Sequence, residues 1–192
     1  AIALGVDQIR RYHRETPELF VSQQLFTATD AIGFSYGVSW NTVRRNIFNW
    51  KDEAVGKLEA KVKSFCAIPQ VLAFLKEYIV FAEKDEELNK YILRQHQTGA
   101  VDATVSRALD PGRTRGLVWH TQGSGKTALA FYAVHFLTDY YRRRGSVRKF
   151  YFIVDRIDLL EHASKEFRSR GLRVHTINSR DEYAADIKSN LA

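Results

Sequence analysis

The stretch Trp119-His120-Thr121-Gln122-Gly123-Ser124-Gly125-Lys126-Thr127 decides the fold of this chain. Two glycines separated by one residue let the backbone approach a polyphosphate closely, because neither carries a Cβ. Backbone N–H groups at the start of a following helix then form an anion-binding site. The Lys126 ammonium can reach the β- and γ-phosphates of a nucleoside triphosphate, and the Thr127 hydroxyl can hold Mg²⁺. The stretch therefore predicts a nucleotide-binding loop.

The residues on either side of this loop predict a strand before it and a helix after it. Residues 116–119 form a short apolar run, which is typical of a buried strand. Downstream, apolar side chains recur at the spacing of one helix face. They are Leu129, Tyr132, Ala133, Phe136, Leu137 and Tyr140. A strand, a Gly-rich turn and a helix are the context that this motif needs, although His120 stands where the strict motif has Gly or Ala.

Length, composition and charge limit the class of protein. A chain of 192 residues forms one to two domains, and 45% hydrophobic residues are enough for a packed core. The formal net charge of +7 is compatible with a nucleic-acid partner. No apolar run reaches the roughly 20 residues of a membrane span, so we expect no membrane partner. The single Cys66 cannot form an internal disulfide, which favours a cytoplasmic location.

The first half of the chain reads as a helix, then strands, then helices. We expect a helix over residues 1–16, which Pro17 ends. Within 18–40, apolar residues at 32, 34, 36 and 38 alternate with small ones, which indicates a strand whose small face lies close to another layer or to a ligand. The apolar spacing of residues 54–92 predicts helices.

In the second half the pattern becomes helix, strand, helix, strand. A helix over 91–109 precedes the loop, and apolar runs at 150–154 and 172–177 predict two further buried strands. Asp158 with Glu161, and Ser179 with Glu182, have the spacing of helix starts; the Arg142-Arg143-Arg144 run closes the helix after the loop. Alternating strands and helices imply a parallel sheet, whose ligands bind at the carboxyl ends of its strands.

Three stretches together resemble the motor subunit of type I restriction enzymes. The Walker-type run at 116–127 is similar to that of this family, and its Thr-x-Gly-Ser-Gly-Lys-Thr form is typical of superfamily 2 motors. Residues 152–159 resemble the family's second helicase motif. Residues 8–12, which have the pattern Gln-x-x-x-Tyr, together with 16–20 resemble the tail of its nuclease domain.

The resemblance implies an α/β fold in three parts. Residues 1–52 would be the α/β tail of a PD-(D/E)xK-type nuclease domain and 53–88 a helical linker. Residues 89–192 would be the beginning of a RecA-like parallel-sheet motor lobe.

The resemblance also assigns roles to individual residues. ATP and Mg²⁺ would bind at Gln97, Thr121, Gln122, Gly123, Ser124, Gly125, Lys126 and Thr127, with Gln97 recognising adenine and Thr127 holding the metal. Asp155 and Arg156 would lie near the DNA, with Arg156 holding a phosphate. Gln8 and Tyr12 match the auxiliary nuclease motif. Simpler readings stay open for all three groups: an exposed helical glutamine, a surface ion pair, and a helix face that packs on the sheet.

The implied function is that of an ATP-dependent DNA translocase and endonuclease subunit, acting on double-stranded DNA beside methyltransferase and specificity subunits. No acidic-x-Lys pair of the family's nuclease precedes Gln8, and the family's Asp-Glu box and second-lobe arginines are absent as well. We therefore expect a piece of a longer protein that is inactive alone. One alternative is a superfamily 2 helicase or remodeller without a nuclease. Another is a nucleotide-binding module without a motor. A small-molecule kinase is disfavoured by His120.

Overall fold

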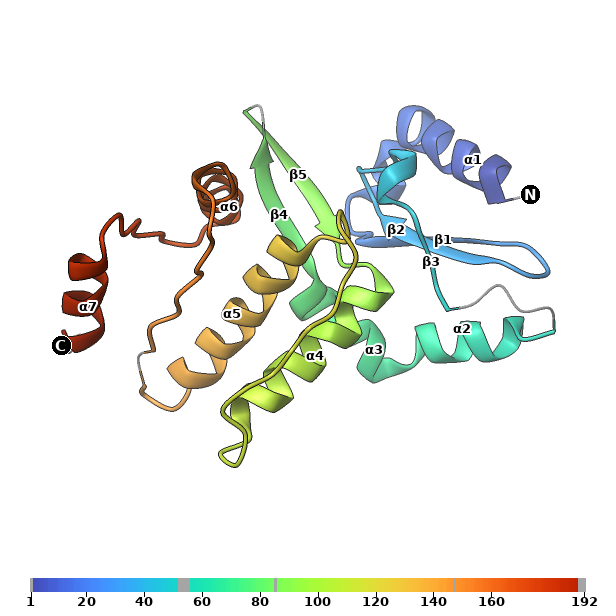
Figure 1. The fold of residues 1–192 in the computed structure, drawn as a ribbon. Helices are drawn as coiled ribbons and strands as arrows, with labels where there is room; N and C mark the ends of the chain where they lie inside the picture. The colour runs from blue at the N-terminus through green and yellow to red at the C-terminus, as the bar shows by residue number, and fades with distance from the viewer. Residues whose placement is uncertain (1, 52–55, 85, 147, 190–192) are drawn as a thin grey trace. The chain divides into compact units, whose positions relative to one another are not determined.

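The computed structural model describes residues 2–51, 56–84, 86–146 and 148–189, and it divides into two compact units (Figure 1). The first unit comprises residues 1–102 and the second 103–192. The fold is mixed α/β, with helices and two small antiparallel sheets among the described residues.

The first unit begins with a helix that packs on a three-stranded sheet. Its elements up to the second sheet are α1 Ile2–Glu15, η1 Pro17–Phe20, β1 Leu25–Thr29, β2 Phe34–Val38, η2 Arg44–Asn46, β3 Phe48–Asn49, α2 Leu58–Cys66, α3 Ile68–Ala73 and the π turn η3 Phe74–Tyr78. The strands lie in the order β1-β2-β3, and both pairs are antiparallel. The predicted helix over 1–16 and the strand at 34–38 are thus confirmed.

The small residues in and just before β2 lie close to Phe26 of β1 and to Ile2 of α1. A Cβ on Gly37 would lie 2.7 Å from the Phe26 ring, and one on Gly33 would lie 2.7 Å from the Ile2 side chain of α1. Val6 of α1 is buried in the same cluster as Phe26. The predicted close layer is therefore α1 together with the neighbouring strand.

The opposite face of β2 carries an aromatic core. Tyr36, Trp50, Phe65 and Phe74 are each at most 5% exposed. Every pair among these four rings has its centroids 5.1–5.8 Å apart, in tilted or edge-on geometry. This cluster joins β2 to α2 and to η3.

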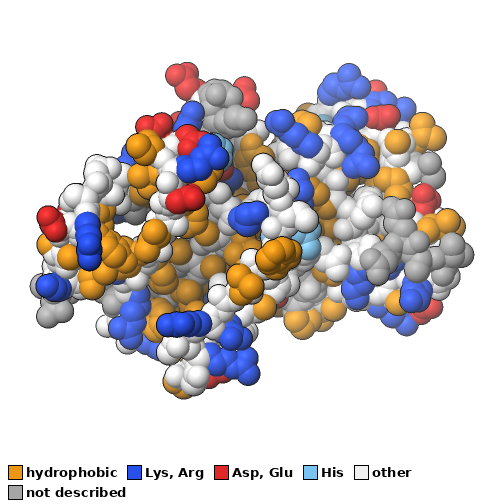
Figure 2. Space-filling model, viewed as in Figure 1, with side chains coloured by type: hydrophobic (Ala, Val, Ile, Leu, Met, Phe, Trp, Pro, Cys, Tyr) orange, Lys and Arg blue, Asp and Glu red, His pale blue; other side chains and the backbone are white. Residues whose placement is uncertain are grey.

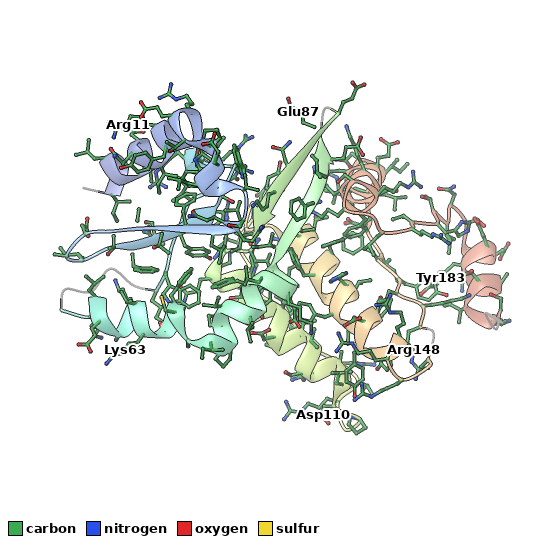
Figure 3. All side chains as sticks on the ribbon, turned by 180° about the vertical axis from the view of Figure 1, so that it is seen from behind. Arg11, Lys63, Glu87, Asp110, Arg148 and Tyr183 are labelled. Atoms are coloured by element: carbon green, nitrogen blue, oxygen red, sulfur yellow. The ribbon has the colours of Figure 1, made fainter. Side chains whose placement is uncertain are left out.

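The segments 79–84 and 87–92 correct the predicted helix. They form a hairpin of β4 Ile79–Lys84 and β5 Glu87–Ile92, with Glu87 near its tip (Figure 3). Helical spacing over so short an apolar segment is ambiguous, and β-branched Ile79 and Val80 with Phe81 favour an extended backbone. The following helix, α4 Gln95–Leu109, consequently begins four residues later than predicted.

The second unit contains three further helices: α5 Lys126–Arg142, α6 Ile157–Ser169 and α7 Arg180–Lys188. Buried side chains of α5 and α6 form its core, namely Leu129, Phe131, Tyr132, Ala133, Leu137, Ala163 and Phe167. The predicted helix face after the loop is thus confirmed. At the end of α5, both Arg142 and Arg143 pair with Asp139.

The helix starts predicted at Asp158 and Ser179 correspond to the beginnings of α6 and α7. Ser179 Oγ accepts a hydrogen bond from the Glu182 N–H (3.1 Å), while the Glu182 carboxylate accepts one from the Asn178 N–H (3.1 Å). This reciprocal cap confirms the predicted start of α7. The start at Asp158 is wrong by two residues, because α6 begins at Ile157 and its N-cap position is Arg156.

The predicted parallel strands at 116–119, 150–154 and 172–177 are not formed in the part of the chain that the structure describes. These segments are extended or irregular, and no ladder hydrogen bonds join them. Their apolar side chains are consequently exposed: Leu117 and Trp119 are each 85% exposed and Ile153 is 75% exposed. Figure 2 shows apolar side chains at the surface of this region. An apolar run supplies only the local part of a strand, whereas the ladder requires a paired neighbour.

Side-chain contacts instead hold the segment around residue 150 against α7. The Tyr151 hydroxyl donates to Asp186 Oδ2 (2.7 Å), and Lys149 Nζ donates to the Asp186 carbonyl (2.7 Å). Tyr183 of α7, which is labelled in Figure 3, meets the Tyr151 ring edge-on, with centroids 5.2 Å apart. None of the helices in the described ranges is both long and apolar enough to cross a membrane.

Candidate nucleotide-binding site

The predicted phosphate-binding loop leads directly into α5, whose first residue is Lys126. Gly123 has φ +75°, and Gly125, the N-cap residue, has φ +83° and ψ +39°. Both lie in the left-handed region that disfavours residues with a Cβ. These two positions therefore explain why the turn needs both glycines.

The Lys126 side chain folds back over this loop. Its Nζ donates to the carbonyl oxygens of His120 (3.2 Å) and Thr121 (3.0 Å). The Ser124 hydroxyl also donates to the Thr121 carbonyl (2.7 Å). The loop is thus closed around one carbonyl oxygen, with the exposed ammonium of Lys126 held at its mouth.

The residues of this loop fit a nucleotide phosphate and its Mg²⁺. A Cβ on Gly123 would have no atom within 4 Å, so the backbone at this position is open to a ligand. No acidic side chain lies in the first turn of α5, whose N-terminus carries the positive end of the helix dipole. Thr127 follows Lys126 in that turn and brings a hydroxyl suited to Mg²⁺. Within the described ranges no cluster of three or more His, Cys, Asp or Glu residues is placed to hold a metal.

Gln97 lies in the first turn of α4 and is only 6% exposed. Its Oε1 accepts a hydrogen bond from the Arg94 N–H (2.9 Å). The alternative of an exposed helical glutamine is therefore wrong, while adenine recognition stays a prediction. Gln97 belongs to the first unit and the Gly-rich loop to the second.

Arg156 makes a bidentate ion pair with Asp158, at 2.6 Å from Nη2 and 3.1 Å from Nε. Both side chains are more than 60% exposed, so the pair contributes little stability. Asp155 beside them is exposed. The surface ion pair considered as an alternative is thus formed, and the DNA contact stays a prediction.

Gln8 and Tyr12 are brought together on α1, where the Gln8 amide donates to the Tyr12 hydroxyl. Tyr12 is 38% exposed. The face of α1 that packs on the sheet is formed by Ile2, Val6 and Ile9 instead. An auxiliary nuclease role for the pair stays a prediction.

A cavity lined by Arg44, Arg45 and Arg94 in the first unit was missed by reasoning from the sequence. The adjacent arginines at 44 and 45 were a signal, but the sequence does not show that Arg94 lies near them.

Comparison with known proteins places the loop in a family. The model of the SWI2/SNF2 ATPase matches residues 96–191, which is half of the chain. The chain belongs to the SWI2/SNF2 ATPase family. The matched region of the chain contains the Gly-rich loop and also Gln97, Asp155 and Arg156.

Curated relatives extend the likeness into the part before residue 96. A putative type I restriction enzyme MjaVIIP endonuclease subunit of Methanocaldococcus jannaschii is 32% identical over 188 residues, covering 85% of this chain and 16% of the relative. The SauCOLORF180P endonuclease subunit of Staphylococcus aureus is 29% identical over 167 residues, covering 84% of this chain and 17% of the relative. The HindI endonuclease subunit of Haemophilus influenzae is 28% identical over 144 residues, covering 66% of this chain and 14% of the relative.

The resemblance of this chain to type I restriction endonuclease subunits is therefore confirmed. The chain spans only about a sixth of the length of the first two relatives.

Proposed function

We propose that this chain belongs to an ATP-dependent DNA translocase and endonuclease subunit of a type I restriction enzyme. The observation that carries the proposal is the Gly-rich loop, with two left-handed glycines and Lys126 as the first residue of α5. The named relatives support the restriction context, because they match the chain on both sides of residue 96.

ATP and Mg²⁺ are the proposed ligands of the loop. Backbone N–H groups of residues 121–127 and the Lys126 ammonium bind phosphate oxygens, Thr127 holds Mg²⁺, and Gln97 recognises adenine. Bound Mg²⁺ supplies charge neutralisation on the phosphates. The chain's own contribution is to position the polyphosphate and to stabilise its negative charge.

The wider activity follows from the same proposal. Hydrolysis drives movement along duplex DNA, with Asp155 and Arg156 near the DNA, and cleavage occurs far from the recognition site. Residues 1–52 belong to the nuclease part, where Gln8 and Tyr12 orient DNA, 53–88 connect the parts, and 89–192 begin a RecA-like lobe. Methyltransferase and specificity subunits are the proposed partners, in the cytoplasm.

The change Lys126→Ala in the full-length protein tests the loop. We expect DNA-stimulated ATPase activity to be lost and DNA binding to be retained, because the ammonium contacts phosphates of the nucleotide. Lys165→Ala is the matched control, since Lys165 is an exposed lysine on α6 of the same unit. ATP hydrolysis by Lys126→Ala at nearly the wild-type rate would refute the assignment.

The change Arg156→Ala tests the DNA contact. Loss of one phosphate contact reduces the slope of log K against log salt by about 0.9. Arg173→Ala, at another exposed arginine of the second unit, is the control. An unchanged slope for Arg156→Ala would leave only the ion pair with Asp158.

A superfamily 2 helicase or remodeller without nuclease activity is the second candidate. The SWI2/SNF2 match favours it, because that match covers only residues 96–191. Incubation of the assembled complex with ATP and a circular plasmid separates the two candidates. Linear product supports the restriction subunit, and ATP hydrolysis on intact circles supports the helicase.

A further inference from the structure

A cavity of about 560 Å³ lies in the first unit, between the segment around β3 and the start of α4. The side chains that define its character are Arg44, Arg45, Phe48, Arg94, Gln95 and His96. The described residues that line it include three arginines and one histidine, and they include no carboxylate. Such a lining is suited to an anion.

Among the described residues, no carboxylate pairs with the three arginines, in contrast to seven of the other arginines. Arg10, Arg11, Arg113, Arg142, Arg143, Arg156 and Arg170 each pair with a carboxylate. In contrast, Arg44 donates to the Ile47 carbonyl (3.2 Å), and Arg94 stacks over the Phe48 ring at 5.2 Å. Neither contact neutralises charge, so the guanidinium groups keep their positive field within the cavity.

The two walls of the cavity are fixed to each other. The Gln95 side-chain oxygen accepts a hydrogen bond from the Lys51 N–H (2.7 Å), which joins the segment after β3 to α4. Just before Arg94, the Leu93 carbonyl accepts from the buried Tyr36 hydroxyl (2.8 Å). The backbone of both walls is therefore held in place before a ligand arrives, which lowers the entropic cost of binding.

The helix that begins at this cavity adds to the same potential. α4 is 15 residues long, and its first residues, Gln95 and His96, line the cavity. The N-terminus of a helix carries the positive end of its dipole. The helix end and the three arginines thus act in the same direction.

We propose that this cavity binds backbone phosphate groups of a nucleic acid. Guanidinium groups match phosphate oxygens in a planar, bidentate geometry. Arginines spread over two walls suit successive phosphates of a polymer. The proposal goes beyond the proposed function, because it involves neither the Gly-rich loop nor Arg156.

The change Arg45→Gln in the full-length protein tests the proposal. Arg45 is exposed, so its substitution leaves the core unchanged. Anisotropy of a fluorescein-labelled duplex, measured over a range of KCl concentrations, gives the affinity and its salt dependence. We expect weaker binding and a slope reduced by about 0.9 for each lost phosphate contact. The matched control is Arg14→Gln, an exposed arginine of α1 in the same unit, which changes the net charge equally.

Three results would overturn the proposal. Equal effects of Arg45→Gln and Arg14→Gln would show that only net charge matters. A normal salt slope with weakened binding of a fluorescent ATP analogue would assign the cavity to nucleotide phosphates. Normal binding of both ligands by the double variant Arg44→Gln, Arg45→Gln would exclude a phosphate site. Each is separable from failure of the loop assignment, which is read from the ATPase activity of Lys126→Ala.

Discussion

The hydroxyl of Tyr36 is a buried link between β2 and the start of α4, and its removal gives a defined prediction. Tyr36 is 0% exposed, and it donates to the carbonyl of Leu93, a residue that is 2% exposed. Tyr36→Phe keeps the ring contacts with Trp50, Phe65 and Phe74 and removes only the hydrogen bond. A buried carbonyl that loses its donor costs about 1–3 kcal/mol, so we expect the free energy of unfolding to fall by that amount.

Urea unfolding followed by tryptophan fluorescence measures this change, because the Trp50 ring lies 5.8 Å from the Tyr36 ring. The control is Tyr91→Phe, since Tyr91 is half-buried on β5. We expect its effect to be within about 0.5 kcal/mol. A loss below about 0.5 kcal/mol for Tyr36→Phe would show that the Leu93 carbonyl does not depend on this donor. A loss of about 4 kcal/mol or more would mean that the ring packing had also changed, as in a large-to-small core substitution.

Three further changes follow from contacts in the second unit and from the pKa of one carboxylate. Ser179→Ala removes the N-terminal cap of α7 and should lower the stability of that helix by about 1 kcal/mol, which faster amide exchange in α7 would reveal. The control Ser189→Ala, at the other end of α7, should leave amide exchange at the start of the helix unchanged. Gly125→Ala forces a Cβ into the left-handed region and should cost about 1–2 kcal/mol; unchanged ATPase activity and stability in the full-length protein would contradict the strain. The hydrogen bond from Tyr151, followed by the contacts of Lys149, lowers the pKa of Asp186 below its ordinary 3.8. The charged carboxylate stabilises the fold above pH 3.8, and this contribution is lost as the pH falls through the lowered pKa. The difference in urea midpoint between wild type and Asp186→Asn should therefore shrink in acid. A difference that does not depend on pH would refute this link between protonation and stability.

Local chemistry explains which parts of the fold could be predicted from the sequence. The glycines at 123 and 125 with Lys126 specify a turn and a helix start without reference to other residues. The same holds for the reciprocal cap of Ser179 and Glu182. The alternation around Tyr36 was equally clear, because small residues occupy one face of β2, where Gly37 leaves room for the Phe26 ring of β1.

Non-local pairing accounts for what could not be predicted. Leu75, Tyr78 and Ile79 have helical spacing, yet the chain changes to a strand at Ile79 because β5 is available as a partner. The runs at 150–154 and 172–177 have the composition of buried strands, but a ladder depends on neighbours that composition does not specify. The cavity between Arg45 and Arg94 also depends on contacts over long sequence separations, of which the bond between Lys51 and Gln95 is one.

The exposed extended segments that contain Leu117, Trp119 and Ile153 also determine how the 192-residue chain behaves as a solute. A segment with apolar side chains whose backbone N–H and C=O groups form no ladder is a template for pairing with a strand from another molecule. Two copies that meet along these segments would gain hydrogen bonds and buried apolar area, while salt screens the repulsion from a net charge of +7. Self-association of the isolated chain should therefore increase with protein concentration and with ionic strength, and a single charged residue in place of Ile153 should oppose it.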